Sequence, residues 1–171
     1  MEDIKNKTAL ITGAGSGIGK ATAELYATLG ANVVASDVNE VHGQEVVAQI
    51  KAAGGNAIFI KADVSDAAAC EALVAGTVKQ YGSLDIAVNN AGIGGEANFA
   101  ADMSIEGWNK VIAVNLSSVF YCMKYELQQM LKQGNGAIVN MASILGQVGF
   151  ATASGYVAAK HGVVGLHKMR Q

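Results

Sequence analysis

The sequence predicts an α/β fold, in which a doubly wound parallel sheet carries helices on both faces. Short apolar runs alternate strictly with longer segments whose apolar residues recur every three or four positions, and the first apolar run leads into a glycine-rich loop. Buried parallel strands are apolar throughout and need helical crossovers between them. The 171 residues suffice for one core, so we expect a single domain over residues 1–171.

The first unit consists of a strand, a glycine loop and a helix, expected at residues 8–11, 12–19 and 20–29. Glycines allow the backbone to turn tightly and to approach a ligand closely. A helix that begins there presents unpaired N–H groups and the positive end of its dipole. We therefore expect a pyrophosphate site, although a glycine-rich turn alone would look similar. Its candidate residues are Gly13, Ser16, Gly17, Ile18 and Gly19.

The later units continue the alternation. Further strands are expected at residues 32–36, 56–60, 84–88 and 137–141. Helical spacing of apolar residues predicts helices at 41–50, 67–80 and 108–131, and a last helix that begins near 154. Right-handed crossovers, together with a glycine loop after the first strand, predict a Rossmann sheet with the strand order 3-2-1-4-5.

Composition excludes several classes of partner. The formal net charge is -2 without a basic run, so neither nucleic acid nor an anionic membrane is expected. The N-terminus is too polar for a signal peptide, and we expect a cytoplasmic protein. Cys70 and Cys122 are far apart in the sequence and are interpreted as ordinary buried thiols. Neither they nor the three histidines have ligand spacing, so no metal site is expected.

Two aspartates follow strands at the carboxyl edge of the predicted sheet. Asp37 ends the second strand, where an acid binds the adenosine ribose hydroxyls and repels a 2′-phosphate. No arginine or lysine lies beside it in the sequence, which favours NAD over NADP. Asp63 and Val64 follow the third strand and are candidates for contact with adenine. A helix N-cap or a turn aspartate is the alternative for Asp37, and a turn is the alternative for Asp63.

The segment after the fourth strand contains Asn90, Ala91 and Gly92, and small residues there let the backbone approach a cofactor. An asparagine-rich turn is the alternative. Asn115 interrupts the apolar pattern of the long predicted helix. Because asparagine is a poor residue for a helix interior, it either faces solvent or holds a polar site together.

Three residues near the end of the chain are candidates for acid/base chemistry. Ser143 follows the fifth strand. Tyr156 and Lys160 are one turn apart and so share a face of the last helix. A cation that close favours the phenolate, which makes the tyrosine a usable acid/base group. Taken alone, such a pair is more often a surface pair.

Several motifs occur together in one order, and in this the chain resembles the short-chain dehydrogenase/reductase family up to residue 166. The motifs are Thr12-Gly13-x3-Gly17-Ile18-Gly19, Asn89-Asn90-Ala91-Gly92, Asn115, Ser143 and Tyr156-x3-Lys160. The resemblance implies NAD-dependent hydride transfer between nicotinamide and an alcohol or carbonyl carbon. It further implies the roles of four residues. Tyr156 exchanges a proton with the substrate oxygen, Ser143 hydrogen-bonds that oxygen, Lys160 stabilises the phenolate and binds the nicotinamide ribose, and Asn115 holds a water that relays protons.

Members of this family continue with two more strands and a loop that covers the substrate. We therefore expect a C-terminally truncated member that lacks the family's last two strands. The alternative function is a catalytically impaired module for dinucleotide binding or assembly. The predicted partner is a small alcohol or ketone, of a kind that the sequence does not specify. The resemblance also implies a homodimer or homotetramer, and apolar residues beyond one stripe of the long helix, such as Val114 and Met130, support it.

Overall fold

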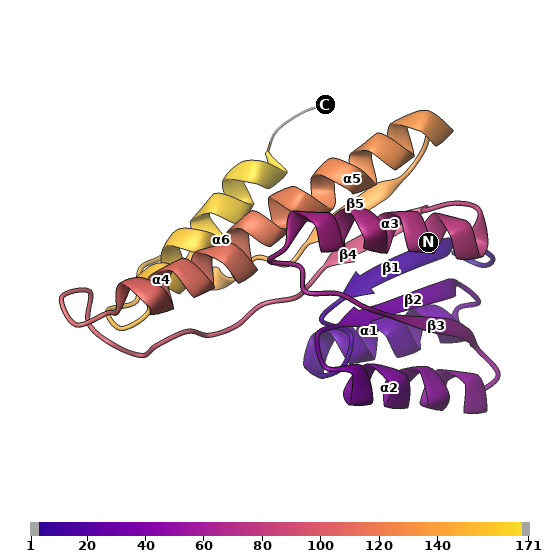
Figure 1. Ribbon diagram of the computed structural model, residues 1–171, viewed down its shortest axis with the longest axis horizontal. Coiled ribbons are helices and arrows are strands. Elements are labelled where there is room, and N and C mark those ends of the chain that lie inside the picture. The colour runs from indigo at the N-terminus through magenta and orange to yellow at the C-terminus, as the bar shows by residue number, and fades with distance from the viewer. Residues whose placement is uncertain (1–3, 169–171) are drawn as a thin grey trace.

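The computed structural model describes residues 4–168, and five parallel strands form its single sheet in the order β3-β2-β1-β4-β5 (Figure 1). The strands are β1 Thr8–Thr12, β2 Asn32–Asp37, β3 Asn56–Lys61, β4 Ile86–Asn89 and β5 Ala137–Asn140. The register places Leu10 opposite Val34 on one side and Ala87 on the other. The predicted fold class and strand order are therefore confirmed.

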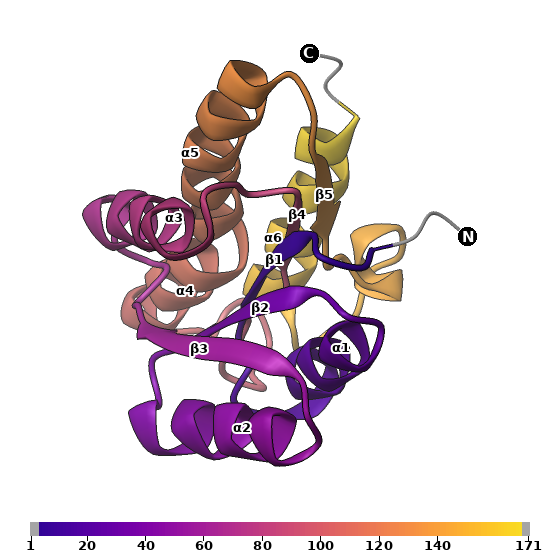
Figure 2. The same cartoon turned by 90° about the vertical axis from the view of Figure 1, so that its right-hand side faces the viewer.

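The helices cover the two faces of this sheet. Helices α1 and α2 lie on one side of the strands, and α3 and α5 lie on the other (Figures 1 and 2). The last helix, α6, packs against α4 and the segment that follows α4. The helices are α1 Gly17–Thr28, α2 Glu40–Ala52, α3 Ala67–Tyr81, α4 Ile105–Ile112, α5 Ser118–Gln133 and α6 Ser154–His167, and a 3-10 turn covers Ile144–Gly146.

Side-chain caps explain where several helices begin. Asn39 accepts a hydrogen bond from the His42 N–H at the start of α2, and Asp66 accepts one from Ala68 at the start of α3. Each cap satisfies one of the N–H groups that a helix start leaves without a partner. The cap of α2 is thus Asn39 and not Asp37, so the N-cap interpretation of Asp37 is wrong.

The long helix predicted over residues 108–131 is interrupted in the structure. A helical run extends from Ile105 to Gln133, but residues Ala113–Ser117 form a π-helical segment between α4 and α5. The segment contains Asn115, which is fully buried. A π-bulge inserts one extra residue into an α-helix and is often found at functional sites.

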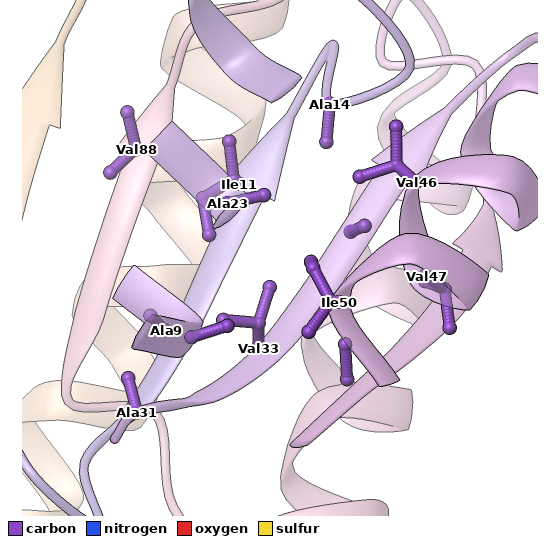
Figure 3. Close-up of a cluster of buried hydrophobic side chains, with 13 residues drawn as sticks. Ala9, Ile11, Ala14, Ala23, Ala31, Val33, Val46, Val47, Ile50 and Val88 are labelled. Atoms are coloured by element: carbon purple, nitrogen blue, oxygen red, sulfur yellow. The ribbon is translucent and has the colours of Figure 1, made fainter. Parts of the chain in front are cut away.

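The core consists of two layers on opposite faces of the sheet. Alternate residues of a strand point to opposite faces, so Ile11 packs under α1 and α2 whereas Leu10 packs towards α3. Figure 3 shows the first layer, in which Ala9, Ala23 and Val33 lie between strands and helices. Small side chains at these positions let the first helix lie close to β1.

Cys70 and Cys122 are buried, as predicted, but their distance in the sequence is misleading. Their sulfur atoms lie 3.6 Å apart where α3 packs on α5, and Cys122 donates a hydrogen bond to Cys70. This bond, together with burial, raises the pKa of Cys122, so its thiol stays protonated.

None of the helices within residues 4–168 is long and apolar enough to cross a membrane.

Candidate active site

The glycine loop brings the start of α1 against the ends of β1 and β4. Gly13 and Gly17 have φ values of +63° and +54°, a region that favours glycine. A Cβ at Gly19 would overlap the carbonyl oxygen of Gly13 and crowd the Asn90 amide. Ser16 precedes α1 without a side-chain cap. The first N–H groups of this helix are therefore left to other partners, which makes its N-terminus suitable for an anion.

The carboxylate of Asp37 is fixed at the mouth of this loop. Its Oδ2 accepts the N–H of Gly15 at 2.9 Å, and its Oδ1 accepts the N–H of Asn39 at 2.9 Å. Asp37 lines a cavity of about 590 Å³, which also contains Gly13, Ser16, Gly17, Ile18, Asp63, Val64, Asn90, Ala91, Gly92 and Ile93. The carboxylate therefore faces the space where the sequence analysis predicts the adenosine ribose.

Asp63 and Val64 lie on the wall of the same cavity. Asp63 Oδ1 accepts hydrogen bonds from the Ser65 hydroxyl at 2.7 Å and the Ser65 N–H at 2.9 Å, and these bonds lower the pKa of Asp63. The turn expected as the alternative role thus exists, and the carboxylate lines the cavity at the same time. Val64 is 6% exposed and accepts a hydrogen bond from Cys70 through its carbonyl oxygen.

The end of β4 is tied directly to the glycine loop. The hydroxyl oxygen of Thr12 accepts the N–H groups of Asn90 and Ala91 at 3.0 and 3.2 Å. The Asn90 side chain in turn donates to the carbonyl oxygens of Thr12 and Gly13 at 3.0 and 3.3 Å. Asn90 is therefore part of a fixed corner between two strands, which is more than an ordinary turn provides.

Asn115 holds the segment that follows β4. It is 0% exposed, so the alternative that it faces solvent is wrong. Its Oδ1 accepts the N–H of Ile93 at 2.8 Å, and its Nδ2 donates to the Ile93 carbonyl at 2.7 Å. The side chain thus mimics a strand partner for Ile93, which lines the cavity. The water relay implied for Asn115 stays a prediction.

Ser143, Tyr156 and Lys160 line a second cavity of about 620 Å³. The Lys160 ammonium donates to the Met141 carbonyl at 2.6 Å and lies 5.6 Å from the centre of the Tyr156 ring. Lys160 is 4% exposed, and burial lowers its pKa. A surface pair would be exposed, so that alternative is wrong for these two residues. The hydroxyl of Ser143 accepts the N–H of Leu145 at 3.2 Å.

The two cavities meet. Ile18, Asn90, Gly92 and Ile93 line both of them. One continuous depression therefore runs along the carboxyl edge of the sheet, from Asp37 to the Tyr156 and Lys160 pair. Ligands of doubly wound sheets bind at this edge, where the strand order reverses.

Sequence reasoning missed several residues that build this site. Met141 contributes only a backbone carbonyl, for which a sequence carries no signal. Ile93 is recognised only through its bond to Asn115. Lys110 lines the cavity that contains Asp37, one helical turn before Val114. The sequence predicted that Lys110 lies in a helix, but it did not predict which side of that helix faces the cavity.

Comparison with known proteins finds the same family that the sequence motifs resemble. The family model described as short chain dehydrogenase matches residues 7–171. Cyclohexanol dehydrogenase of Acinetobacter sp. (strain SE19) is 55% identical over 165 residues, which are 96% of this chain and 66% of that protein. The crystal structure of levodione reductase is 40% identical with a TM-score of 0.92, covering 95% of this chain and 64% of that one.

A second solved structure contains a cofactor. It is a short chain dehydrogenase/reductase from Burkholderia phymatum in complex with NAD, with 37% identity and a TM-score of 0.94. The match covers 97% of this chain and 59% of that one. The chain therefore spans less than two thirds of the length of each of these three relatives.

Proposed function

The chain belongs to the short chain dehydrogenase family, and we propose that it carries the cofactor-binding and catalytic residues of an NAD-dependent oxidoreductase. The reaction interconverts an alcohol and a carbonyl compound. The observation that carries this proposal is the continuous depression, which has Asp37 at one end and Tyr156 with Lys160 at the other.

The residues of this depression fit a dinucleotide. Gly13 and Gly19 let the loop pack closely on Asn90, and the N–H groups at the start of α1 would bind the pyrophosphate. Asp37 would bind the adenosine ribose hydroxyls, while Asp63 and Val64 would contact the adenine ring. When NAD is bound, its nicotinamide ring supplies or accepts the hydride. A related structure in complex with NAD supports this choice of cofactor.

Tyr156 is the proposed general acid/base. In the oxidising direction its oxygen takes the hydroxyl proton of the substrate, and in the reducing direction it returns that proton to the carbonyl oxygen. The Lys160 ammonium lies near the ring and favours the negative charge that the phenolate carries. Ser143, on the same cavity wall, would hydrogen-bond the substrate oxygen and so orient it.

The proposed substrate is an uncharged alicyclic secondary alcohol, or the corresponding ketone. The catalytic cavity is lined by apolar side chains, among them Ile93, Leu145 and Phe150. Lys160 is the one charged side chain among its described lining residues, and its ammonium already binds the Met141 carbonyl. A carboxylate or phosphate on the substrate would find no free cation there. The similarity to a cyclohexanol dehydrogenase points to a ring of about that size.

The experiment is a turnover assay that follows NADH with cyclohexanol, a linear secondary alcohol and a hydroxy acid as substrates. We expect oxidation of the ring alcohol to exceed that of the hydroxy acid. Tyr156→Phe should reduce oxidation of the ring alcohol by about 10²- to 10⁴-fold. A protein that binds no NADH, or that oxidises the hydroxy acid best, contradicts the proposal. The two results separate the cofactor assignment from the substrate assignment.

A further inference from the structure

Glu126 is a carboxyl group enclosed in the interior, close to the proposed site. It lies on α5 and is 0% exposed. Its Oε2 accepts a hydrogen bond from Nδ2 of Asn89, the last residue of β4, at 3.0 Å. The same Nδ2 donates to Oδ1 of Asn140, the last residue of β5, at 3.0 Å. The Asn89 amide therefore links the carboxyl group of a helix to the carboxyl end of the neighbouring strand β5.

This cluster lacks the partners that an ionised carboxylate needs. Within residues 4–168, Glu126 forms no ion pair, and both Glu126 Oε1 and Asn89 Oδ1 are buried without a hydrogen-bond partner. The group bonded to it is the Asn89 amide from β4, which in turn bonds the Asn140 amide from β5. The titratable neighbours are two thiols, Cys122 one turn away on α5 and, bonded to it, Cys70 from α3.

A neutral carboxyl group suits this surrounding better than a charged one. The protonated acid adds a donor to a cluster that has two unpaired acceptors, whereas the carboxylate is an uncompensated charge in the interior. Burial accordingly raises the pKa of Glu126 to about 7, against the smaller opposing effect of the Asn89 hydrogen bond.

Asn89 connects this carboxyl group to both halves of the proposed site. The residue after it, Asn90, binds the carbonyl oxygens of Thr12 and Gly13 in the glycine loop. The backbone carbonyl of Asn89 accepts the N–H of Met141 at 2.9 Å, and the Met141 carbonyl accepts the Lys160 ammonium at 2.6 Å. The path from Glu126 therefore branches to the cofactor cavity and to the catalytic lysine.

We propose that Glu126 is a positioning residue whose neutral form holds the ends of β4 and β5 in the arrangement that binds the dinucleotide. This inference rests on the proposed function, because it concerns the same cofactor site. When Glu126 ionises, it has no proton to donate to the unpaired Asn89 Oδ1, the buried charge draws in water, and the corner at Asn90 loosens. Affinity for the cofactor should then fall as the pH rises through the titration of Glu126, a group that touches neither cofactor nor substrate.

The first test is NADH affinity as a function of pH in the wild-type protein, Glu126→Gln and Glu45→Gln. Coupling between two sites is commonly worth 5- to 150-fold, so we expect wild-type affinity to drop at least about 5-fold between pH 6 and pH 8.5. The neutral glutamine should remove this drop. Glu45→Gln is the matched control, because Glu45 is an exposed glutamate on α2, and it should keep the wild-type profile.

A purely structural role for Glu126 gives a different result. In that case Glu126→Gln weakens NADH binding by the same factor at every pH, and the slope of the wild-type profile remains. That outcome overturns the inference and leaves the proposed function intact. Glu126→Leu adds a second variant, and it should bind more weakly than Glu126→Gln with an equally flat profile.

The second test needs no cofactor. In a pH titration of the free protein by NMR, the amide signals of Asn90 and Met141 should shift with one common midpoint. That midpoint should equal the one reported by the carboxyl carbon signal of Glu126. In Glu126→Gln these shifts should vanish. If neither protein binds NADH at any pH, the proposed function fails, and the amide shifts alone decide whether Glu126 controls the two strand ends. Amide signals that ignore the Glu126 titration overturn the inference.

Discussion

Asp37 lies at the proposed adenosine end of the cavity, where its carboxylate would provide a fixed negative charge. Its carboxylate is held by the N–H groups of Gly15 and Asn39, so it cannot turn away from a 2′-phosphate at little cost. We predict that NADH binds at least ~10-fold more tightly than NADPH, a difference of about 1.4 kcal/mol. Fluorescence titration of both cofactors measures the ratio.

Replacing Asp37 should change the ratio of NADH affinity to NADPH affinity and have little effect on the free energy of unfolding. Asp37→Ser removes the repelling charge and is expected to bring the two affinities closer together. Asp102→Ser, which removes an exposed loop carboxylate, is the matched control and should keep the wild-type ratio. Equal affinities for both cofactors in the wild-type protein would be evidence against the role of Asp37.

Variants of Tyr156 and Lys160 distinguish proton transfer from cofactor binding. Tyr156→Phe should reduce turnover by about 10²- to 10⁴-fold and leave NADH affinity almost unchanged, because only the hydroxyl group is lost. Lys160→Ala should reduce both turnover and affinity, because the lysine has two proposed roles. Tyr26→Phe, on α1, is the control for loss of a tyrosine hydroxyl. A Tyr156→Phe protein with more than about a tenth of wild-type turnover would refute the mechanism.

The π-helical segment between α4 and α5 contains Asn115, and we expect this side chain to hold the segment in place. Asn115 satisfies both backbone groups of Ile93, and an unsatisfied buried group costs about 1–3 kcal/mol. Asn115→Ala should therefore lower the free energy of unfolding by an amount in this range or above it. It should also weaken cofactor binding, since Ile93 lines both cavities.

Chemical denaturation and NADH titration measure these two effects. Asn109→Ala, at an exposed position one and a half turns earlier in α4, is the control and should leave both quantities unchanged. If Asn115→Ala unfolds no more easily than the control, then the segment is held by packing and not by this side chain.

The outer surface of α4 and α5 is the proposed surface for self-association. The sequence analysis pointed to Val114 and Met130, but Met130 is 6% exposed and packs in the core, so it cannot serve there. The exposed apolar residues of these helices are instead Ile105, Trp108, Phe120 and Leu131. We predict a dimer or tetramer at micromolar concentration in analytical ultracentrifugation.

Substitution tests which residues carry that association. Trp108→Glu combined with Phe120→Glu should shift the protein towards a monomer, because two charges would have to be buried in the interface. Val41→Glu, at an exposed apolar position on α2, is the control and should leave the oligomeric state unchanged. A wild-type monomer would contradict the prediction.

For the whole molecule, Glu126 should make stability fall as the pH rises. Its pKa is about 7 in the folded protein, against an ordinary value of 4.5. The folded state therefore binds this proton more tightly than the unfolded state, and the cost of ionisation appears above pH 4.5 and is complete above about pH 7. At about 1.4 kcal/mol per unit of pKa, the cost approaches about 3 kcal/mol.

Urea unfolding at pH 5 and pH 8 checks this prediction. The free energy of unfolding of Glu126→Gln should fall less between the two pH values than that of the wild-type protein, and Glu45→Gln should behave as the wild type does. The difference between variants isolates Glu126 from the other titrating groups, and Asp63, whose lowered pKa leaves it ionised at both pH values, does not contribute to the change. Parallel curves for wild type and Glu126→Gln would show that Glu126 is ionised at little cost.

The sequence by itself determined the fold and most of the candidate site. Apolar strands, helical spacing and a glycine loop are local signals, and they predicted the strand order correctly. Asp37 and Asn90 were found because the carboxyl ends of parallel strands must meet at one edge, whatever the side chains in between. Tyr156 and Lys160 were found because they are one helical turn apart and match a family motif.

Only the tertiary structure decided which surface each side chain faces and what it touches. The contact between Cys70 and Cys122 depends on how α3 packs on α5, and the bond of Lys160 to Met141 involves a backbone carbonyl. In the sequence, Glu126 is a charged residue four positions from both Cys122 and Met130, a spacing that places it on the same face of α5 as these two residues. Its partner Asn89 lies on a strand far away in the sequence, and such pairs form only when helices and strands from separate units pack together.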